Sequence, residues 1–369
     1  MASFLRSGRG RVILVGMVVG AMLLAASALW YWSGHVARQA APERLHCALP
    51  EQKTGQVHLV HPGMVWVAGG SFEVGAVVYP EEQPLRRTTV TGFWMDRTEV
   101  TNQQFADFVR ATGYITVAER AVNPSLQSSL PPEMRQPGAV VFVMPNEISG
   151  RSSLTQWWRY LPGAQWRHPG GPGTGIGDRD SFPVVTVTFE DASAYARWKG
   201  RELPTEAEWE WAARAGQHQA GRDHGQPKLA NTWQGLFPVV NSGEDGFVGL
   251  APAGCYPPNA LGLFDMIGNV WELTADAYRP SHLEPLAALS DPTPAAPSTG
   301  SAGQRVIKGG SFLCAPNYCM RYRSGSRQPQ DDDLGASHLG FRTVLRAPGP
   351  LALPQAPPLM PATTAMVSR

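Results

Sequence analysis

Short apolar runs that end at glycines dominate the central part of the chain. The run Met64–Val67 leads into Gly69 and Gly70, and the run Thr88–Val90 leads into Gly92. Strands of this length, rich in β-branched and aromatic residues and bounded by glycine, are typical of sheets with many turns. The pattern therefore predicts a domain built mainly from short strands and loops, with helices confined to a few segments.

Three helices are predicted, and each begins at a threonine followed three residues later by glutamine or an acid. In such a capping box, the threonine side chain and the third helical side chain each accept a hydrogen bond from the other residue's backbone N–H. The pairs are Thr101 with Gln104, Thr188 with Asp191, and Thr205 with Glu208. Gly200 and Gly216 are expected to end the second and third helices. The residues expected to be buried are Phe105, Phe108 and Val109; Ala192, Tyr195, Ala196 and Trp198; and Trp209, Ala212 and Ala213.

An uncharged run of 21 residues, Val12–Trp32, precedes these patterns. At about 1.5 Å per helical residue, it can cross a hydrocarbon core of about 30 Å. Three arginines lie in residues 1–11, so the positive-inside rule leaves this N-terminus in the cytoplasm and the rest of the chain outside it. A cleaved signal peptide is the alternative, because the Ala-Ser-Ala tripeptide at 26–28 fits a signal-peptidase site. Both interpretations give an extracytoplasmic domain, attached to the membrane through residues 12–32 in the first and secreted or periplasmic in the second.

The remaining organisation follows from changes in composition along the chain. Residues 33–60 are polar and patternless, which predicts a linker, whereas residues 61–346 hold the strand and helix patterns, which predicts one domain. Within that domain, residues 116–182 are expected to be mostly loop. The Pro-, Ala- and Ser-rich stretch 286–303 is expected to be a flexible excursion, and residues 347–369 a proline-rich disordered tail.

Composition excludes several classes of protein. The 369 residues carry 31 Lys and Arg against 30 Asp and Glu, a formal net charge of +1, so the chain lacks the basic field that binds nucleic acid. With 39 Gly, 33 Pro and 12 Trp, the sequence does not fit a coiled coil or a helical solenoid. Its four cysteines are too few for a disulfide-stapled fold and show no zinc-ribbon spacing, so each is considered individually.

Two neighbouring cysteines form the densest candidate for chemistry. Cys314 and Cys319 are separated by four residues, and Pro316 favours a turn that brings the two sulfurs together. Three interpretations stay open on physical grounds. They are a structural disulfide, a two-thiolate metal site, for which soft sulfur selects Cu(I), and a redox-active dithiol helped by the positive charges of Arg321 and Arg323.

Five short sequence words, in order along the chain, are more specific than these patterns. They are Glu-Val-Thr-Asn-Gln-Gln-Phe at 99–105, Leu-Pro-Thr-Glu-Ala-Glu-Trp-Glu at 203–210, Gly-Asn-Val-Trp-Glu-Leu-Thr at 268–274, Gly-Gly-Ser-Phe at 309–312 and Leu-Gly-Phe-Arg at 339–342. With them, residues 61–346 resemble the formylglycine-generating enzyme family, also called sulfatase-modifying factors. The resemblance implies a mixed α+β fold of low regular secondary structure, similar to the C-type lectin fold.

The resemblance also implies a chemistry for the two thiols. Aerobic members of the family hold Cu(I) between two cysteines, and Cys314 and Cys319 match both positions. The implied reaction uses O2 as co-substrate and converts a cysteine in a Cys-x-Pro-x-Arg segment of an unfolded sulfatase polypeptide into Cα-formylglycine, which activates the sulfatase. Four further positions match the family's active-site residues: Ser311, Trp271, Tyr318 and Arg321. From the residues alone, Ser311 also fits a turn hydroxyl and Trp271 a core side chain.

Structural calcium ions are implied in the same way. Asn231, Thr232, Asp245 and Phe247 match one calcium site of the family, and Asp265, Gly268, Val270 and Glu272 match a second. Amide and carboxylate oxygens mixed with main-chain carbonyls are the ligands that Ca²⁺ takes in proteins. Asp245 also fits the simpler role of capping its own turn.

A substrate groove is the last feature that the resemblance implies. Trp166, Arg167 and His168 match a loop that lines this groove in the family, so the peptide is expected between residues 157–177 and 309–323. An isolated histidine such as His168 is more often a structural residue than a ligand.

Cys47 and Cys255 have no place in this scheme. We expect Cys255 to be a buried small apolar side chain, and Cys47 to be unpaired or to form an intermolecular disulfide. Two functions of other classes stay open. One is a membrane-tethered binding module that keeps the fold without the activity, and the other is a thiol-disulfide oxidoreductase that uses Cys314 and Cys319 without copper or O2.

Overall fold

The computed structural model of the chain describes Cys47 and residues 61–150, 154–216, 227–282 and 303–347. The apolar run 12–32, the rest of the predicted linker, most of the 286–303 stretch and the tail after residue 347 lie outside these residues. The expectations for those segments therefore stay predictions. Within the described residues, no helix combines the length and the apolar character that a bilayer crossing requires.

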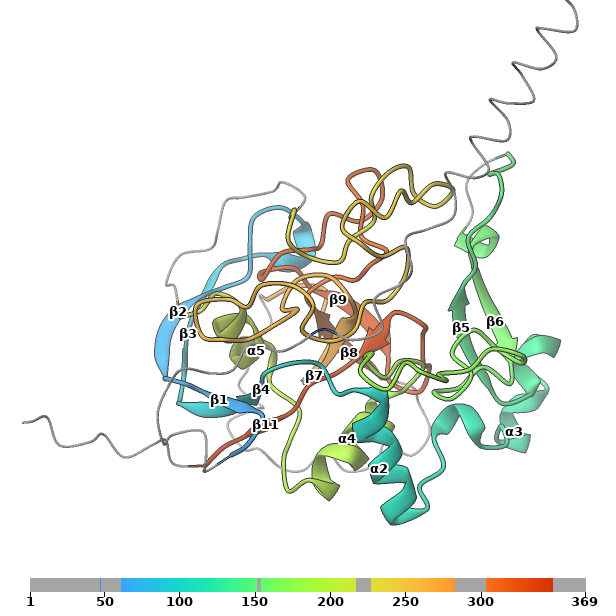
Figure 1. Cartoon of the computed structure of the whole chain (residues 1–369), viewed down its shortest axis with the longest axis horizontal. Helices are drawn as coiled ribbons and strands as arrows, with labels where there is room; N and C mark the ends of the chain where they lie inside the picture. The colour runs from blue at the N-terminus through green and yellow to red at the C-terminus, as the bar shows by residue number, and fades with distance from the viewer. Residues whose placement is uncertain (1–46, 48–60, 151–153, 217–226, 283–302, 348–369) are drawn as a thin grey trace, which may run out of the picture. The chain divides into compact units, whose positions relative to one another are not determined.

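Small sheets form the framework of the described residues (Figure 1). One sheet has the strand order β1 (Met64–Val67), β4 (Phe93–Asp96) and β11 (Val344–Leu345), with antiparallel neighbours. A second has the order β10 (Leu339–Gly340), β7 (Trp271–Ala277), β8 (Gln304–Lys308) and β9 (Gln328–Asp331), in which β10 lies parallel to β7. Two separate antiparallel strand pairs complete the framework: β2 (Gly70–Val74) with β3 (Arg86–Val90), and β5 (Gly138–Phe142) with β6 (Trp158–Pro162). The strands β10 and β11 thus join the end of the domain to strands much earlier in the chain.

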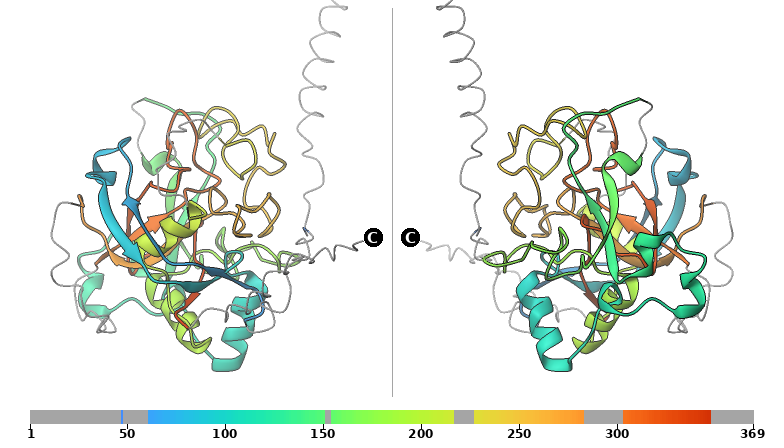
Figure 2. Two further views of the ribbon diagram at one scale, coloured as in Figure 1. Left: turned by 90° about the vertical axis from the view of Figure 1, so that its left-hand side faces the viewer. Right: turned by 90° about the vertical axis from the view of Figure 1, so that its right-hand side faces the viewer.

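The three predicted helices are confirmed, together with their capping boxes. They are α2 (Asn102–Thr112), α4 (Phe189–Trp198) and α5 (Glu206–Ala213). In each, the threonine hydroxyl accepts from the third backbone N–H at 3.2 to 3.3 Å. A further short helix, α3 (Pro124–Gln127), and 3₁₀ turns at 80–82, 117–119, 132–135 and 154–156 lie in the connections. Helices α2 and α4 pack side by side, as Figures 1 and 2 both show.

The apolar faces of these helices are buried as predicted, except that Ala213 is only partly buried and Trp198 is exposed. Phe105 and Tyr195 stack between α2 and α4, with ring centroids 6.0 Å apart. The burial predicted for Trp198 is wrong, since this side chain is 38% exposed at the end of α4. Its ring contacts Phe108 on one side, and the ammonium of Lys199 lies over it at 5.0 Å. An amphipathic ring at a helix end can bury one face and leave the other in water.

Residues 116–182 are mostly loop, as predicted, but they also contain the paired strands β5 and β6, which the sequence did not reveal. The two strands are separated by residues 143–157, so no tight-turn sequence marks this hairpin. The backbone N–H of Val140 also bonds the carbonyl of Gly335 at 2.9 Å. This hairpin therefore borders the segment that precedes β10.

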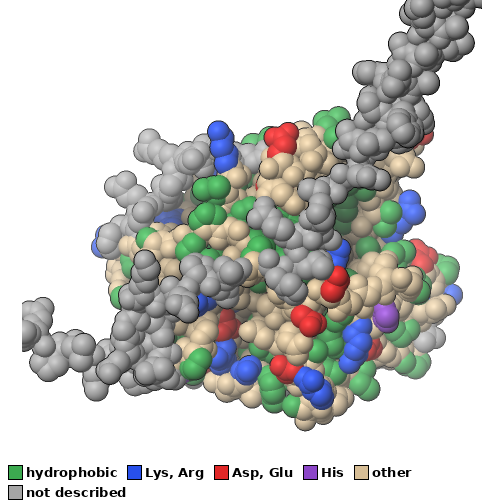
Figure 3. Space-filling model, viewed as in Figure 1, with side chains coloured by type: hydrophobic (Ala, Val, Ile, Leu, Met, Phe, Trp, Pro, Cys, Tyr) green, Lys and Arg blue, Asp and Glu red, His purple; other side chains and the backbone are tan. Residues whose placement is uncertain are grey.

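The core of the domain brings the second sheet, two helices and the thiol segment together. One cluster of buried side chains contains Phe105, Tyr195, Trp271 and both Cys314 and Cys319. A second cluster packs α5 through Trp209 against the first sheet and β2. On the face drawn in Figure 3, cationic and anionic side chains are interspersed, in agreement with a net charge near zero.

Candidate active site

Two free thiols face one another at the end of a tight turn that follows β8. The sulfurs of Cys314 and Cys319 are 2.8 Å apart, farther than the about 2.05 Å of a covalent disulfide. Both side chains are buried, with 1% and 6% of their surface exposed. The backbone N–H of Cys319 bonds the carbonyl of Ala315 at 2.9 Å, and this turn brings the sulfurs together as the sequence predicts. No covalent bond joins the two sulfurs, so the structure does not support the structural-disulfide interpretation.

The two thiols differ in acidity because they share one hydrogen bond. Burial, followed by the neighbouring Cys319, raises the pKa of Cys314 well above its ordinary value. The hydrogen bond from Cys314 lowers the pKa of Cys319, and contacts with Arg321 act in the same direction. Cys319 is therefore the thiol that ionises first, and Cys314 is the donor that stabilises its thiolate.

A cavity of about 400 Å³ opens onto the pair. Four residues that the resemblance assigns to the active site line it together with both cysteines: Ser311, Trp271, Tyr318 and Arg321. Further wall residues come from Trp158, from all of β9 and from the 334–338 segment, together with Val140, Gln304 and Leu313. A volume of this size accommodates a short stretch of an extended peptide.

The surroundings of the four matched residues show what each does in the fold. Ser311 is fully buried; its N–H lies 3.5 Å from the sulfur of Cys314, and its hydroxyl accepts from the N–H of Leu313 at 3.3 Å. Trp271 belongs to the core cluster and also lines the cavity, so its position is compatible with both interpretations of this side chain.

The two remaining matched residues lie nearer the surface. Tyr318 is 40% exposed, and its ring stacks on Phe237 with centroids 4.0 Å apart. The guanidinium of Arg321 pairs with Glu81 at 2.5 Å and lies over the ring of Tyr79. Arg321 is thus held in place by two contacts beside Cys319.

The predicted wall 157–177 contributes Trp158 to the cavity, but its three matched residues lie elsewhere. Trp166, Arg167 and His168 are absent from the residues that line the cavity. Trp166 is buried against Phe105 at 5.2 Å, Arg167 pairs with Glu119 at 3.0 Å, and Nδ1 of His168 lies 2.6 Å from the carbonyl oxygen of Thr174. These side chains make their contacts within their own part of the fold, and the cavity is lined by Trp158 together with β9 and residues 334–338. The substrate groove itself stays a prediction.

His338 is a cavity residue that the sequence analysis missed. Its ring lies 4.6 Å from that of Trp158, and its Nδ1 is buried without a hydrogen-bond partner in the described residues. Burial lowers the pKa of His338 to about 3, so the ring is neutral at physiological pH. The residue follows the irregular segment before β10, and no sequence motif marked it.

Comparison with known proteins decides the family. Residues 50–347 match the Sulfatase-modifying factor enzyme 1-like domain. The chain belongs to the sulfatase-modifying factor family. It is 47% identical to a formylglycine-generating enzyme of Mycobacterium tuberculosis over 289 residues, which cover 76% of this chain and 97% of that protein. It is also 37% identical to the inactive Cα-formylglycine-generating enzyme 2 of Mus musculus, over 79% of this chain and 89% of that protein.

The fold expected for a sulfatase-modifying factor is confirmed. The structure of PvdO from Pseudomonas aeruginosa is similar, with a TM-score of 0.50, 25% sequence identity, and coverage of 76% of this chain and 93% of that one. Few helices and small mixed sheets, as described above, agree with an α+β fold of low regular secondary structure.

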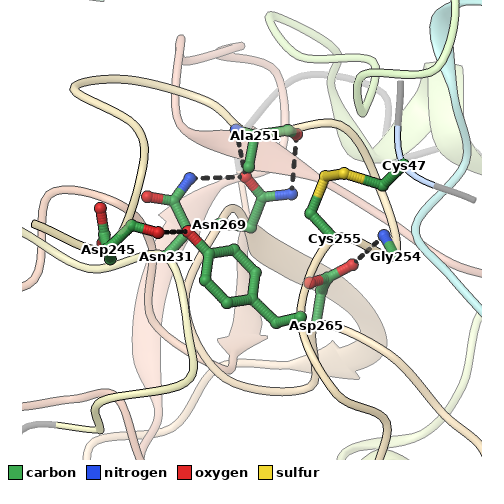
Figure 4. Close-up of a disulfide and its surroundings, with 9 residues drawn as sticks. Cys47, Asn231, Asp245, Ala251, Gly254, Cys255, Asp265 and Asn269 are labelled. Atoms are coloured by element: carbon green, nitrogen blue, oxygen red, sulfur yellow. Dashed lines mark hydrogen bonds between the residues drawn. A yellow bond between two sulfur atoms is a disulfide. The ribbon is translucent and has the colours of Figure 1, made fainter. Parts of the chain in front are cut away.

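The first calcium site expected for this family has its residues brought together. Oδ2 of Asp245 accepts from the N–H of Thr232 at 2.9 Å, and Oδ1 accepts from the N–H of Phe247 at 3.2 Å. The amide nitrogen of Asn231 donates to Gly249 and Asn269, which directs its amide oxygen elsewhere (Figure 4). Burial raises the pKa of Asp245, because removal from water disfavours the charged carboxylate.

In the second expected calcium site, the two carboxylates are already bonded to other groups of the protein. Both oxygens of Glu272 are bonded to Arg342, at 2.7 Å each, and one also accepts from Trp209. A buried guanidinium thus engages both carboxylate oxygens of Glu272, and the assignment of this residue as a calcium ligand stays a prediction. Asp265 accepts from the N–H of Gly254 at 2.5 Å, and Gly268 and Val270 offer only main-chain carbonyls. Among the described residues, no three His, Cys, Asp or Glu side chains are grouped so that they could hold a metal.

The expectations for Cys47 and Cys255 are wrong. The two residues form a disulfide with each other across 208 positions of sequence (Figure 4). Cys255 directly follows Gly254, whose N–H bonds Asp265, so the disulfide fastens Cys47 to this loop. A pairing over such a distance cannot be read from spacing, because four cysteines allow several pairings.

Proposed function

We propose that this protein is a formylglycine-generating enzyme. It would oxidise a cysteine in a Cys-x-Pro-x-Arg segment of an unfolded sulfatase polypeptide to Cα-formylglycine, with O2 as co-substrate and Cu(I) as cofactor. The observation that carries the proposal is the pair of free, buried thiols 2.8 Å apart that lines a cavity of about 400 Å³. Relatives with 40% to 47% identity are named formylglycine-generating enzymes, which supports the same reaction here.

The donor set fits monovalent copper. Cys314 and Cys319 offer two soft sulfurs, and no histidine or carboxylate stands close enough to complete a zinc or calcium site with them in the described residues. Bound there, Cu(I) would supply the one-electron chemistry that O2 requires. The low pKa of Cys319 relative to Cys314 supports metal binding, since thiolates and not thiols are ligands.

The residues of the chain would prepare the peptide and the thiols for that chemistry. Ser311 fixes the turn through its hydroxyl and directs its N–H to Cys314, and Arg321 stabilises negative charge on Cys319. Trp271 and Tyr318 supply apolar walls for the substrate cysteine. The main-chain edge of β9 is available to an extended peptide, which is how many proteins bind peptides.

The reaction balances only with a reductant. One cysteine side chain and one O2, with two electrons and two protons, give one aldehyde, one hydrogen sulfide and one water. We propose an external thiol as the class of reductant, because two thiols release two electrons and two protons when they form a disulfide.

A thiol-disulfide oxidoreductase is the second candidate, because two free thiols 2.8 Å apart, one with a lowered pKa, also suit dithiol exchange. It would require neither O2 nor copper. A binding module without activity is the third, and the inactive relative with 37% identity shows that family membership alone does not decide the question.

We also propose a structural calcium ion at Asn231, Thr232, Asp245 and Phe247, where a carboxylate with a raised pKa lies beside amide and main-chain oxygens. The second set is not proposed, since Glu272 is committed to Arg342. The Cys47–Cys255 disulfide supports an extracytoplasmic domain, because disulfides persist in oxidising compartments. Residues 12–32 would be its membrane anchor or its cleaved signal peptide.

Mass spectrometry tests the proposal directly. The full chain in detergent, loaded with Cu(I), is incubated in air with a Cys-x-Pro-x-Arg peptide and a thiol reductant, and the peptide should become about 18 Da lighter as an aldehyde replaces the thiol. Cys314→Ser and Cys319→Ser should each abolish the conversion, and removal of O2 should stop it. Conversion that persists in either variant would refute the proposal, whereas O2-independent reduction of a generic disulfide would favour the second candidate.

A further inference from the structure

The loop that carries the two thiols is supported by a second loop, residues 228–250. In Figures 1 and 2 the two loops, coloured orange-red and yellow, run side by side. At the first thiol, the backbone N–H of Trp233 donates to the carbonyl of Cys314 at 3.0 Å. The two loops are therefore joined by main-chain hydrogen bonding directly at a sulfur-bearing residue.

A second connection lies between the thiols. The side chain of Asn317 bonds both backbone groups of Phe237: its amide nitrogen donates to the carbonyl at 3.0 Å, and its oxygen accepts from the N–H at 3.3 Å. Next to it, the ring of Tyr318 lies flat on that of Phe237, with an interplanar angle of 8°. A two-point bond of this kind fixes orientation as well as distance.

The exposure of the thiol loop makes this connection important. Pro316, Asn317 and Tyr318 are exposed, whereas the thiols on either side are buried. The backbone hydrogen bond from Cys319 to Ala315 joins two residues of the thiol loop itself, so it does not tie the loop to another segment. The side chain of Asn317 bonds this exposed stretch to a different segment of the domain.

The supporting loop is itself well fixed. Oδ2 of Asp245 accepts from the N–H of Thr232, just before Trp233, and the indole N–H of Trp233 donates to the carbonyl of Val240 at 2.7 Å. Trp233 is fully buried. Phe237 thus belongs to a rigid segment against which the thiol loop can be held.

We propose that Asn317 is a positioning residue that sets the separation of Cys314 and Cys319 by holding their loop to Phe237. The inference rests on the proposed function, since it concerns the affinity of the thiol pair for Cu(I). A pre-positioned pair of ligands binds more tightly than a mobile pair, because less conformational freedom is lost on binding. Loss of the two hydrogen bonds of Asn317 should therefore weaken Cu(I) binding by about tenfold.

Copper affinity of the full chain tests this role. The Cu(I) dissociation constant is measured by competition with a chromophoric Cu(I) chelator for the wild type, Asn317→Ala and Asn123→Ala. Asn317→Ala should bind about tenfold more weakly, and Asn123→Ala, which removes an exposed asparagine whose side chain bonds Ser125 outside both loops, should stay within about twofold of the wild type. Equal affinities for wild type and Asn317→Ala, or an equal loss in Asn123→Ala, would overturn the proposal.

Two further measurements separate positioning from general destabilisation. In metal-free protein, diamide should oxidise Cys314 and Cys319 to a disulfide several-fold more slowly in Asn317→Ala, while the melting temperatures of the two proteins stay close. Asn317→Asp keeps the acceptor for the Phe237 N–H but not the donor to its carbonyl, so its Cu(I) affinity should fall between those of wild type and Asn317→Ala. An affinity for Asn317→Asp below that of Asn317→Ala would contradict the geometry described above.

A double-mutant cycle tests whether the supporting loop acts through Asn317. Asp245→Asn should weaken Cu(I) binding in the wild-type background and have less effect in the Asn317→Ala background. Strict additivity would overturn this part of the proposal. Failure of the wild type to bind Cu(I) would instead refute the proposed function, so the two failures are distinguishable.

Discussion

Arg342 and Glu272 form a two-point ion pair that is closed to solvent. Nε and Nη2 of the guanidinium lie 2.7 Å from Oε2 and Oε1 of the carboxylate, and both side chains are at most 1% exposed. The same guanidinium donates to the carbonyl of Phe264 at 2.9 Å, and the carboxylate accepts from the indole of Trp209. The pair thereby joins the last segment of the domain to β7 and α5.

Replacing Arg342 should therefore cost more than replacing an arginine near the surface. Arg342→Met leaves Glu272 charged, buried and unpaired, and should lower the free energy of unfolding by about 3 to 5 kcal/mol. Arg346 pairs with Glu202 and Glu208 but is 31% exposed, so Arg346→Met should cost about 1 kcal/mol or less. Urea denaturation of both variants checks this, and similar losses would contradict the importance given to burial.

The Cys47–Cys255 disulfide should contribute strongly to stability. It links residues 208 positions apart. A cross-link over so long a loop lowers the conformational entropy of the unfolded chain, which stabilises the fold by about 2 to 5 kcal/mol. Cys255→Ser should lower the melting temperature under non-reducing conditions, and Cys47→Ser with Cys255→Ser should lose no more than the single variant. Thiol titration of the denatured wild type should find only Cys314 and Cys319 reactive, and four reactive thiols would show that the disulfide does not form.

Asp276 should make stability depend on pH. Burial, followed by the nearby charge of Glu206, raises the pKa of Asp276 to about 6, above its value of 3.8 in an unfolded chain. The folded state therefore holds the proton more tightly, so this group stabilises the fold fully below about pH 4, and the contribution is lost as the pH rises through 6.

Asp276→Asn should remove this dependence, because an amide keeps an oxygen acceptor for the N–H of Glu206 and carries no charge. Relative to the wild type, the variant should gain roughly 1 to 3 kcal/mol of unfolding free energy between pH 4 and pH 8. Urea denaturation at both pH values measures the difference. Glu73→Gln, at an exposed position of β2, is the matched control and should show no such change.

The pKa of each thiol should depend on the other thiol. Because the hydrogen bond from Cys314 is the main cause of the low pKa of Cys319, Cys314→Ala should raise that pKa. Cys319→Ala should lower the pKa of Cys314 only part of the way to its ordinary value, since burial is the larger cause of the raised pKa. The pH dependence of alkylation of metal-free protein by iodoacetamide checks both, and an unchanged profile for Cys319 would contradict the shared hydrogen bond.

Local sequence rules predicted the helices and the thiol turn well. The capping boxes at Thr101, Thr188 and Thr205 act within three residues, so the local sequence is enough to predict them. The pairing of β5 with β6 was missed because the strands are joined by a long irregular segment. The exposure of Trp198 was missed because a helical face alone does not say where the neighbouring layer ends.

The residues of the candidate site likewise divide into those that the sequence predicted and those that it did not. Ser311, Trp271, Tyr318 and Arg321 were found because they lie in, or beside, recognisable words and do line the cavity. His338 and the β9 wall were not found, because they reach the cavity by tertiary packing of segments without a motif. The matched residues of the Trp166 loop do not line the cavity, because they make their contacts elsewhere.

The chain holds one oxidised cysteine pair and one reduced pair, and this governs how it can be handled. A strong dithiol reductant that protects Cys314 and Cys319 during purification will also open the Cys47–Cys255 bridge and loosen the loop that Gly254 and Asp265 share. A preparation intended for copper loading is therefore better kept in a weak monothiol under inert gas.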